Sequence, residues 1–294
     1  MAAFCVVLSC LVFTVLVLMA TEIKCASNTT AGVDMIFIAD TGHKKVLAAT
    51  LGAYRFRSLV LGDIEVWDVT FSEVNQKLYW ASKHNGHIYQ ANADGSGVKQ
   101  VSSTSHTEPT SLSIDETNQQ IYVAYKGEEL ISSFNLNGTV VRETSVHPAL
   151  SKPGAIHVDS ENGYLYFTQF GRVDRSPLSG GSITNLHYNN DLGEIEAMAV
   201  DVEGQRIVIS DPGNGLVVSM NLDGSLPKVI SSLSSNYKIT DLQFYQGDLY
   251  VSNELEHRSI MKLRNGVGRP VKAYTDNRDV LSYPRKFHIA RVDL

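Results

Sequence analysis

The chain has 294 residues, of which 43% are hydrophobic and 19% are charged, and its formal net charge at pH 7 is -6. This composition is typical of a globular protein with an ordinary core. The acidic balance argues against a nucleic-acid partner, because nucleic acids are bound through a basic surface.

The first predicted element is an uninterrupted apolar run from Cys5 to Ala20. Its length suits the hydrophobic region of a secretory signal peptide and is slightly short for a membrane span. We interpret residues 1–20 as a signal peptide that is cleaved between residues 20 and 26. No Lys or Arg precedes the run, so an uncleaved membrane anchor stays the alternative. Residues 21–33 are predicted to be flexible, and no other stretch is apolar enough to span a membrane in the mature chain.

The cysteine usage is unusual for an exported protein, whereas the sequons agree with export. Cys5 and Cys10 would leave with the signal peptide, so only Cys25 is left and no internal disulfide is predicted. Asn28 and Asn137 each begin an Asn-X-Thr sequon, which predicts glycosylation in the secretory pathway. The expected location is therefore secreted and extracellular.

The remaining residues, 34–294, repeat one phrase six times at intervals of 42 to 44 residues. Each repeat opens on a short apolar strand, which is followed by a polar loop, a second strand, a tight turn and a third strand. The opening strands are centred on Ile36, Leu78, Ile121, Leu165, Ile207 and Leu249. A period in the low forties with four strands per unit is typical of a β-propeller. The predicted fold is all-β, a single six-bladed propeller of four-stranded antiparallel blades.

The C-terminal segment resembles the start of an internal repeat. Residues 283–289 match residues 152–158, which open the fourth unit, whereas residues 35–60 have no first strand before them. The C-terminal strand is therefore predicted to complete the N-terminal blade and to close the ring, so that no sheet edge stays exposed.

Four of the repeated strands carry related phrases: LYWAS from Leu78, LYFTQ from Leu165, IVISD from Ile207 and LYVSN from Leu249. They resemble the YWTD repeat of the low-density lipoprotein receptor class B propellers, and the NLDGS turn at residues 221–225 resembles the turn that follows it. The resemblance covers essentially the whole chain after the signal peptide. It implies a six-bladed propeller that binds protein ligands outside the cell.

The chain also departs from the family pattern. The Asp that ends the repeat and ties neighbouring blades together is retained only at Asp40 and Asp211, so a weaker polar network between blades is expected. The cysteine-rich module that usually follows such propellers is missing, as are a membrane span and a cytoplasmic tail. The chain is therefore interpreted as a divergent, stand-alone member without endocytic-receptor activity.

The loops after each second strand and before each first strand emerge on one face, where propellers usually bind their ligands. On this face we predict an aromatic and acidic patch, because aromatic residues and Arg among mixed charges are typical of interface hot spots. The predicted ligand-binding residues are Trp67, His84, His87, Glu108, Tyr125, Lys126, Phe170, Arg172, Glu196, Tyr237, Glu254, His257, Tyr283 and Arg285. Plainer interpretations exist: Trp67 as a core or channel-lining side chain, and the glutamates as solvated surface.

The nine histidines suggest a pH-dependent interface, or simply exposed and hydrogen-bonded side chains. Two of them, His157 and His288, occupy equivalent first-strand positions close to the predicted channel. His84 and His87 form a lone pair without further spaced ligands, so no metal site and no cofactor is predicted.

No catalytic motif is present, neither a nucleophile elbow nor a zinc-protease helix nor a phosphate loop, and no catalytic residue is predicted. Our hypothesis is a secreted, non-enzymatic module that binds an extracellular protein ligand. The alternative is a calcium-dependent hydrolase or lyase on a six-bladed propeller. Its candidate oxygen ligands would be Asp68, Glu196, Asp241 and Asn253.

Overall fold

The computed structural model describes residues 32–53, 55–59, 65–102, 106–136, 143–211, 215–233, 237–254, 258–268, 270–274 and 281–293. Residues 34–291 form one compact unit, and the description below concerns this unit. The predicted signal peptide, its cleavage site and the sequons at Asn28 and Asn137 lie outside the described residues.

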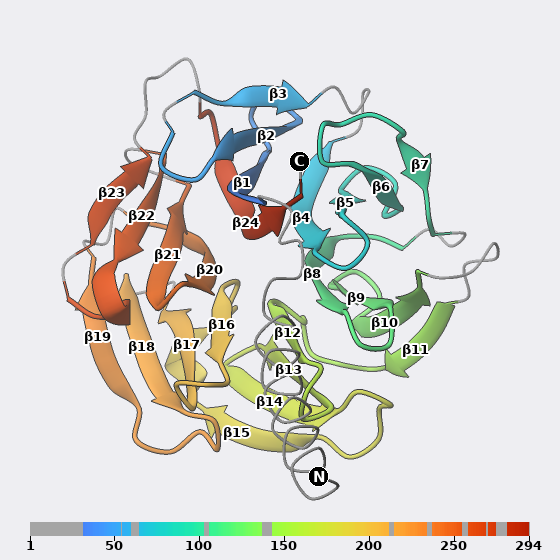
Figure 1. The fold of residues 1–294 in the computed structure, drawn as a ribbon. Helices are drawn as coiled ribbons and strands as arrows, with labels where there is room; N and C mark the ends of the chain where they lie inside the picture. The colour runs from blue at the N-terminus through green and yellow to red at the C-terminus, as the bar shows by residue number, and fades with distance from the viewer. Residues whose placement is uncertain are drawn as a thin grey trace, which may run out of the picture. The chain divides into compact units, whose positions relative to one another are not determined.

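Six four-stranded antiparallel sheets are arranged as blades around a central axis, with one strand of each sheet innermost (Figure 1). Written from the inner strand outward, blade 1 consists of β24 (Pro284–Val292), β1 (Val33–Asp40), β2 (Lys45–Thr50) and β3 (Arg57–Leu59). Blade 2 consists of β4 (Val66–Ser72), β5 (Lys77–Ser82), β6 (Ile88–Asn92) and β7 (Lys99–Gln100). Blade 3 consists of β8 (Pro109–Asp115), β9 (Gln120–Tyr125), β10 (Leu130–Asn135) and β11 (Glu143–His147). Blade 4 consists of β12 (Ile156–Asp159), β13 (Tyr164–Gln169), β14 (Arg172–Pro177) and β15 (Thr184–Tyr188). Blade 5 consists of β16 (Met198–Asp201), β17 (Arg206–Asp211), β18 (Leu216–Asn221) and β19 (Lys228–Ser232). Blade 6 consists of β20 (Ile239–Tyr245), β21 (Asp248–Asn253), β22 (Ser259–Leu263) and β23 (Val271–Tyr274). The predicted six-bladed propeller is therefore confirmed.

Outside the strands, the described residues contain two 3-10 turns, η1 (Asn190–Leu192) and η2 (Arg264–Gly266). No helix among them is long and apolar enough to cross a membrane.

The second strand of each blade is apolar on both of its faces because a neighbouring blade covers each face. In β5, Leu78, Tyr79 and Trp80 are all buried, and in β17 the same holds for residues 207–209. Such runs read as continuous apolar segments rather than alternating ones. The outer strands end in tight turns in which Gly95 and Gly224 have positive φ (87° and 81°), a conformation that glycine adopts at little cost.

The ring closes as predicted, because the C-terminal strand β24 lies beside β1 in the same sheet. Asp40, at the end of β1, accepts hydrogen bonds from the backbone N–H groups of Ser282 (2.6 Å) and Tyr283 (3.0 Å) just before β24 begins. Chain ends joined in one sheet leave no unpaired edge at the seam.

At the position where the repeat ends in Asp, the side chain accepts a backbone N–H even where another residue replaces the Asp. The side-chain oxygen of Gln169 accepts a bond from the Ser151 N–H (2.7 Å), and that of Asn253 accepts one from the Lys238 N–H (3.1 Å). An amide oxygen can accept an N–H as a carboxylate oxygen does, but the hydrogen bond to a charged acceptor is stronger. The contact is therefore retained at these two positions with an uncharged acceptor.

Side chains of the inner strands bind the backbone of the next blade. Asp68 in β4 accepts the Leu112 N–H of β8 (2.7 Å), and Asp241 in β20 accepts the Phe287 N–H of β24 (2.8 Å). Thr240 donates to the carbonyl oxygen of Arg285 across the same seam (2.6 Å). These bonds hold the blades at fixed positions around the axis.

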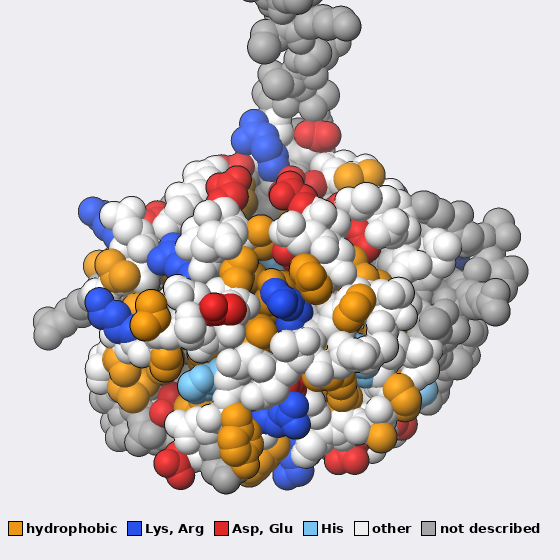
Figure 2. Space-filling model, turned by 90° about the horizontal axis from the view of Figure 1, so that it is seen from below, with side chains coloured by type: hydrophobic (Ala, Val, Ile, Leu, Met, Phe, Trp, Pro, Cys, Tyr) orange, Lys and Arg blue, Asp and Glu red, His pale blue; other side chains and the backbone are white. Residues whose placement is uncertain are grey.

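The charged side chains on one side of the outer rim are not grouped as those at the axis are. Figure 2 looks at the rim on the side of β14 and β15, and there hydrophobic side chains are interspersed with basic, acidic and polar ones. The charged groups at the axis form defined ion pairs around a cavity instead.

Candidate binding site at the channel mouth

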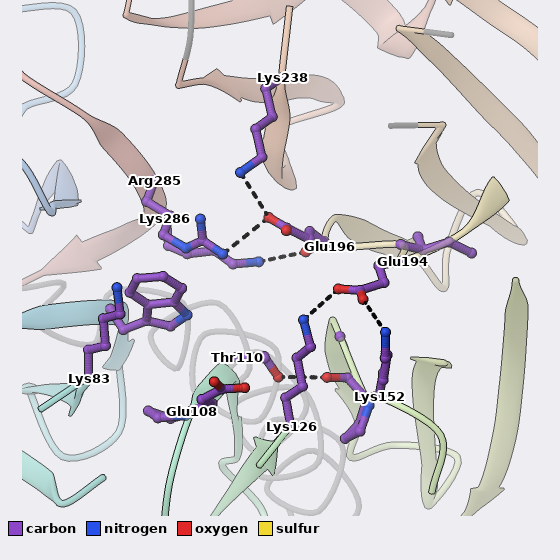
Figure 3. Close-up of a pocket in the computed structure, with 15 residues that line it drawn as sticks. Lys83, Glu108, Thr110, Lys126, Lys152, Glu194, Glu196, Lys238, Arg285 and Lys286 are labelled. Atoms are coloured by element: carbon purple, nitrogen blue, oxygen red, sulfur yellow. Dashed lines mark hydrogen bonds and ion pairs between the residues drawn. The ribbon is translucent and has the colours of Figure 1, made fainter. Parts of the chain in front are cut away.

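A cavity of about 330 Å³ opens where the inner strands begin, at one end of the central axis (Figure 3). Its walls come from residues just before or at the start of the inner strands and from residues just after the second strands. We call these residues the channel mouth: Trp67, Lys83, Glu108, Pro109, Thr110, Lys126, Lys152, Pro153, Gly154, Glu194, Ile195, Glu196, Lys238, Arg285 and Lys286. Six of them are cationic and three are carboxylates, so the mouth itself is basic in a chain that is acidic overall.

On one side of the mouth, two lysines share one carboxylate. Lys126 Nζ lies 2.5 Å from Glu194 Oε2, and Lys152 Nζ lies 2.8 Å from Glu194 Oε1. Hydrogen bonds from the two lysines lower the pKa of Glu194, and the bond to Glu194 raises the pKa of Lys152. All three side chains are partly exposed, so these pairs contribute little to stability.

On the opposite side, two cations share two carboxylates. Arg285 contacts Glu196 (3.1 Å) and Glu254 (3.5 Å), and Lys238 contacts Glu254 (2.9 Å) and Glu196 (3.8 Å). Charge is balanced in this group. Arg285 is 7% exposed and is thereby fixed in one orientation.

The ring of Trp67 lies between two cations. Lys83 Nζ is 4.3 Å from the ring centroid, and Arg285 Cζ is 3.8 Å from it. Both distances are within the range of cation–π attraction. Trp67 is thus half-buried and forms a flat wall of the mouth, which fits both the predicted binding role and the channel-lining interpretation.

The segment Glu194–Ile195–Glu196 reaches from blade 5 into the mouth and is held there by its backbone. The carbonyl oxygen of Ile195 accepts from Thr168 Oγ1 (2.7 Å), and that of Glu196 accepts from Lys286 Nζ (2.8 Å). A Cβ at Gly154 would collide with the Ile195 carbonyl oxygen, so only glycine allows this close approach.

Below the mouth, the same strands line a second cavity of about 380 Å³, which we call the inner channel. Asp68 and Asp241 lie in it beside the buried Lys286, whose Nζ is 3.6 Å from Asp241 Oδ1. Burial raises the pKa of Asp68 to about 7 and also raises the pKa of Asp241, while the charge of Lys286 acts in the opposite direction. Burial raises the pKa of a carboxyl group because the charged form is poorly solvated there.

His157 and His288 belong to blades 4 and 1 and so line the inner channel from opposite sides of the axis. Burial lowers the pKa of each histidine to about 4, and for His288 the neighbouring His157 contributes to this lowering. Both imidazoles are therefore neutral at neutral pH. Their predicted position close to the channel agrees with the structure.

Of the fourteen predicted ligand-binding residues, the channel mouth contains Trp67, Glu108, Lys126, Glu196 and Arg285. Two more lie at its border. Glu254 contacts Arg285 and Lys238, and Phe170 is 42% exposed with Lys152 Nζ 5.6 Å from its ring centroid.

The other predicted residues are placed elsewhere. Tyr125 is fully buried at the end of β9, with the His106 ring 4.6 Å away, and so presents no surface to a ligand. Arg172 pairs with Asp174 within blade 4 (2.9 Å), and Tyr237 packs against the core between blades 5 and 6.

His84 is exposed, His87 lies near Tyr89, and Tyr283 stacks with Arg258 at 4.2 Å. None of these three lines the mouth. His257 lies outside the described residues.

Lys83, Lys238 and Lys286 line the mouth but were not among the predicted residues, and cations outnumber carboxylates there although an acidic patch was expected. A signal was available, because Lys83 and Lys126 both directly follow the second strand of their blade. A cation recurring at the same point of a repeat indicates a shared direction toward the axis.

The oxygens that the alternative calcium-site hypothesis would need are bound by protein groups. Asp68 and Asp241 accept backbone N–H groups, Asn253 accepts the Lys238 N–H, and Glu196 pairs with Arg285. Within the described part of the chain, no group of three or more His, Cys, Asp or Glu side chains is placed to hold a metal ion.

No protein-family profile matches the chain. It is 23% identical over 201 residues to the vitellogenin receptor of Solenopsis invicta, an alignment that covers 65% of this chain and 11% of that receptor. The chain thus spans about a tenth of the length of that relative. The propeller is also similar to a chain in a crystal structure of a nidogen/laminin complex, with a TM-score of 0.74, 16% identity, and coverage of 87% of this chain and 98% of that chain.

The blades and the axial site define the class of protein, a closed six-bladed β-propeller with a charged channel mouth. The resemblance expected from the repeated phrases is confirmed as a resemblance: the chain is similar in sequence to a receptor and in fold to a propeller of a protein complex. One similar protein is a receptor and the other is part of a protein complex, and neither is named as an enzyme.

Proposed function

We propose that the chain is a secreted, non-enzymatic module that binds an extracellular protein ligand through the face that contains the channel mouth. The observation that carries this proposal is the mouth itself, a preformed cavity with an aromatic wall and fixed charges at the axis of a rigid ring. A preformed surface loses little conformational entropy on association. The similarity to a receptor and to a propeller from a protein complex supports the same function.

The predicted signal peptide and the sequons at Asn28 and Asn137 support secretion, and the proposal includes glycosylation at both sites. Mass spectrometry of the chain purified from the medium of secreting cells would test this part. A processed N-terminus between residues 20 and 26 and glycan on both asparagines is the expected result.

The binding function is tested by capture from extracellular fluid of the source organism. The immobilised propeller is compared with a mouth variant, Lys152→Gln with Phe170→Ala, and with a matched variant on the opposite face, Val74→Ala with Leu226→Ala. Val74 and Leu226 are 65% and 77% exposed and lie in turns at the other end of the strands. We expect a protein that the wild type and the opposite-face variant retain and the mouth variant loses. Equal retention by all three would refute the proposal.

A further inference from the structure

The chain places an acidic segment of its own in the basic mouth. Glu194 forms ion pairs with Lys126 and Lys152, and Glu196 forms one with Arg285. The apolar Ile195 is buried between the two glutamates. The mouth therefore already shows which chemistry its cations hold: carboxylates on either side of an apolar residue.

We infer that the part of the protein ligand that enters the mouth is an acidic segment, whose carboxylates bind Lys83, Lys126 and Lys152 and whose apolar portion lies against Pro109 and Pro153. This inference rests on the proposed function and adds the chemistry of the partner. Glu194 is then an internal competitor that occupies two of these lysines until the ligand displaces it.

The distribution of charge supports an anionic occupant. The Arg285 side of the mouth is balanced, with two cations on two carboxylates, but the Lys83 side is not. There, three lysines face Glu108 and Glu194, and Lys126 and Lys152 have one carboxylate between them. The Lys83 ammonium contacts the Trp67 ring, and no carboxylate among the described residues forms an ion pair with it.

The size and lining of the mouth favour a peptide segment over a sulfated sugar chain. A cavity of about 330 Å³ admits a few side chains, and Pro109, Pro153 and Ile195 give it apolar walls beside the lysines. A polysulfated chain would instead be matched by cations spread along an open surface. The mouth offers both charged and apolar contacts within one cavity, as an acidic peptide needs.

The test uses the fluorescence of Trp67 as the readout. The chain has two tryptophans, and Trp80 is fully buried, so a change on ligand addition reports on the mouth. The probes are three capped tripeptides, Glu-Ile-Glu, Gln-Ile-Gln and Lys-Ile-Lys, together with a sulfated heparin disaccharide. We expect Glu-Ile-Glu to bind in the millimolar range, with an affinity that falls as salt is added. The Trp67→Phe variant should lose the signal and so confirm its origin.

Two variants separate the inference from general electrostatics. Glu194→Gln frees two lysines and should tighten Glu-Ile-Glu binding about fivefold, the effect of one partly exposed ion pair. Lys83→Gln, at an exposed position, should weaken it by about the same factor. Thermal melts of both variants verify that the fold is retained.

Three results would overturn the inference: equal binding of the Gln-Ile-Gln probe, tighter binding of the heparin disaccharide, or weaker Glu-Ile-Glu binding by Glu194→Gln. The proposed function fails separately. If capture shows no mouth-dependent partner while the acidic tripeptide binds as described, the acidic site stands without its protein ligand. If capture succeeds and the tripeptide does not bind, only the partner chemistry is wrong.

Discussion

The channel mouth and the inner channel are formed by adjacent residues of the same strands, yet they use charge in different ways. Arg285 and Lys286 are consecutive in β24 and both line the mouth. Arg285 pairs there with the half-buried Glu196 and Glu254, whereas the Lys286 ammonium lies buried beside Asp241 of the inner channel. In the inner channel the carboxylates bind the backbone of the next blade, and in the mouth they bind side chains. The comparison teaches that the inner charges maintain the ring and the outer ones are available to a ligand.

The largest effect is expected in the inner channel. Lys286→Met keeps the volume of the side chain but leaves Asp68 and Asp241 buried without their cation, which should reduce the free energy of unfolding by about 3 kcal/mol. Urea denaturation at pH 7.5 measures this. The matched control in the mouth is Lys152→Met, which removes a partly exposed lysine and should change stability by less than about 1 kcal/mol. Equal losses would erase the distinction between the two regions.

The second prediction concerns the loss of stability as pH falls. His157 and His288 have a pKa of about 4 in the folded chain, below the ordinary value of 6.5, so the unfolded chain binds protons first as pH falls. Their contribution to stability is complete above pH 6.5 and is lost between pH 6.5 and 4, by roughly 2–3 kcal/mol for each histidine.

The double variant His157→Gln and His288→Gln should flatten the fall in stability over this pH range, which denaturation curves at several pH values would show. A fall as steep as that of the wild type would contradict the role given to the two imidazoles.

Asp68 should act in the opposite direction. Its pKa is raised to about 7, so the folded chain holds the proton more tightly than the unfolded chain does. The stability that it contributes is complete below pH 4 and is lost as pH rises from about 4 to 7. Asp68→Asn removes this pH dependence, and it also removes one acceptor for the N–H groups of Val69 and Leu112.

We therefore expect Asp68→Asn to be less stable than the wild type by about 1 kcal/mol below pH 4. Because the variant lacks the titrating carboxyl group, this deficit should shrink as pH rises from about 4 to 7, so the slope of stability against pH changes. An unchanged slope would show that another group takes up the proton.

The fold could be predicted from the sequence, because six recurrences of an apolar strand at one period leave few architectures, and the match of residues 283–289 to 152–158 indicated the closure. The site could be predicted only in part. In β4, β8 and β20 the pairing with the second strand shifts register near the start of the inner strand, for example between Val66 and Asp68. A bulge of this kind changes which side chains face the axis, and strand alternation alone does not reveal it.

The smallest effect on stability is expected at the border of the mouth. Phe170→Ala removes an exposed aromatic side chain and should leave the melting temperature within about 2 °C of the wild type. Affinity for the captured partner should fall at least tenfold, as at an aromatic hot spot. Surface plasmon resonance measures this, with Leu226→Ala on the opposite face as the control. Unchanged affinity would exclude Phe170 from the interface.

The most direct test of the whole account is site-specific photo-crosslinking. A benzoylphenylalanine placed at position 170, beside the mouth, is compared with one at position 226, on the opposite face, after incubation with extracellular fluid and irradiation. The account predicts a covalent adduct with one protein from position 170 and none from position 226. An adduct from position 226 alone, or equal adducts from both, would contradict binding at the channel mouth.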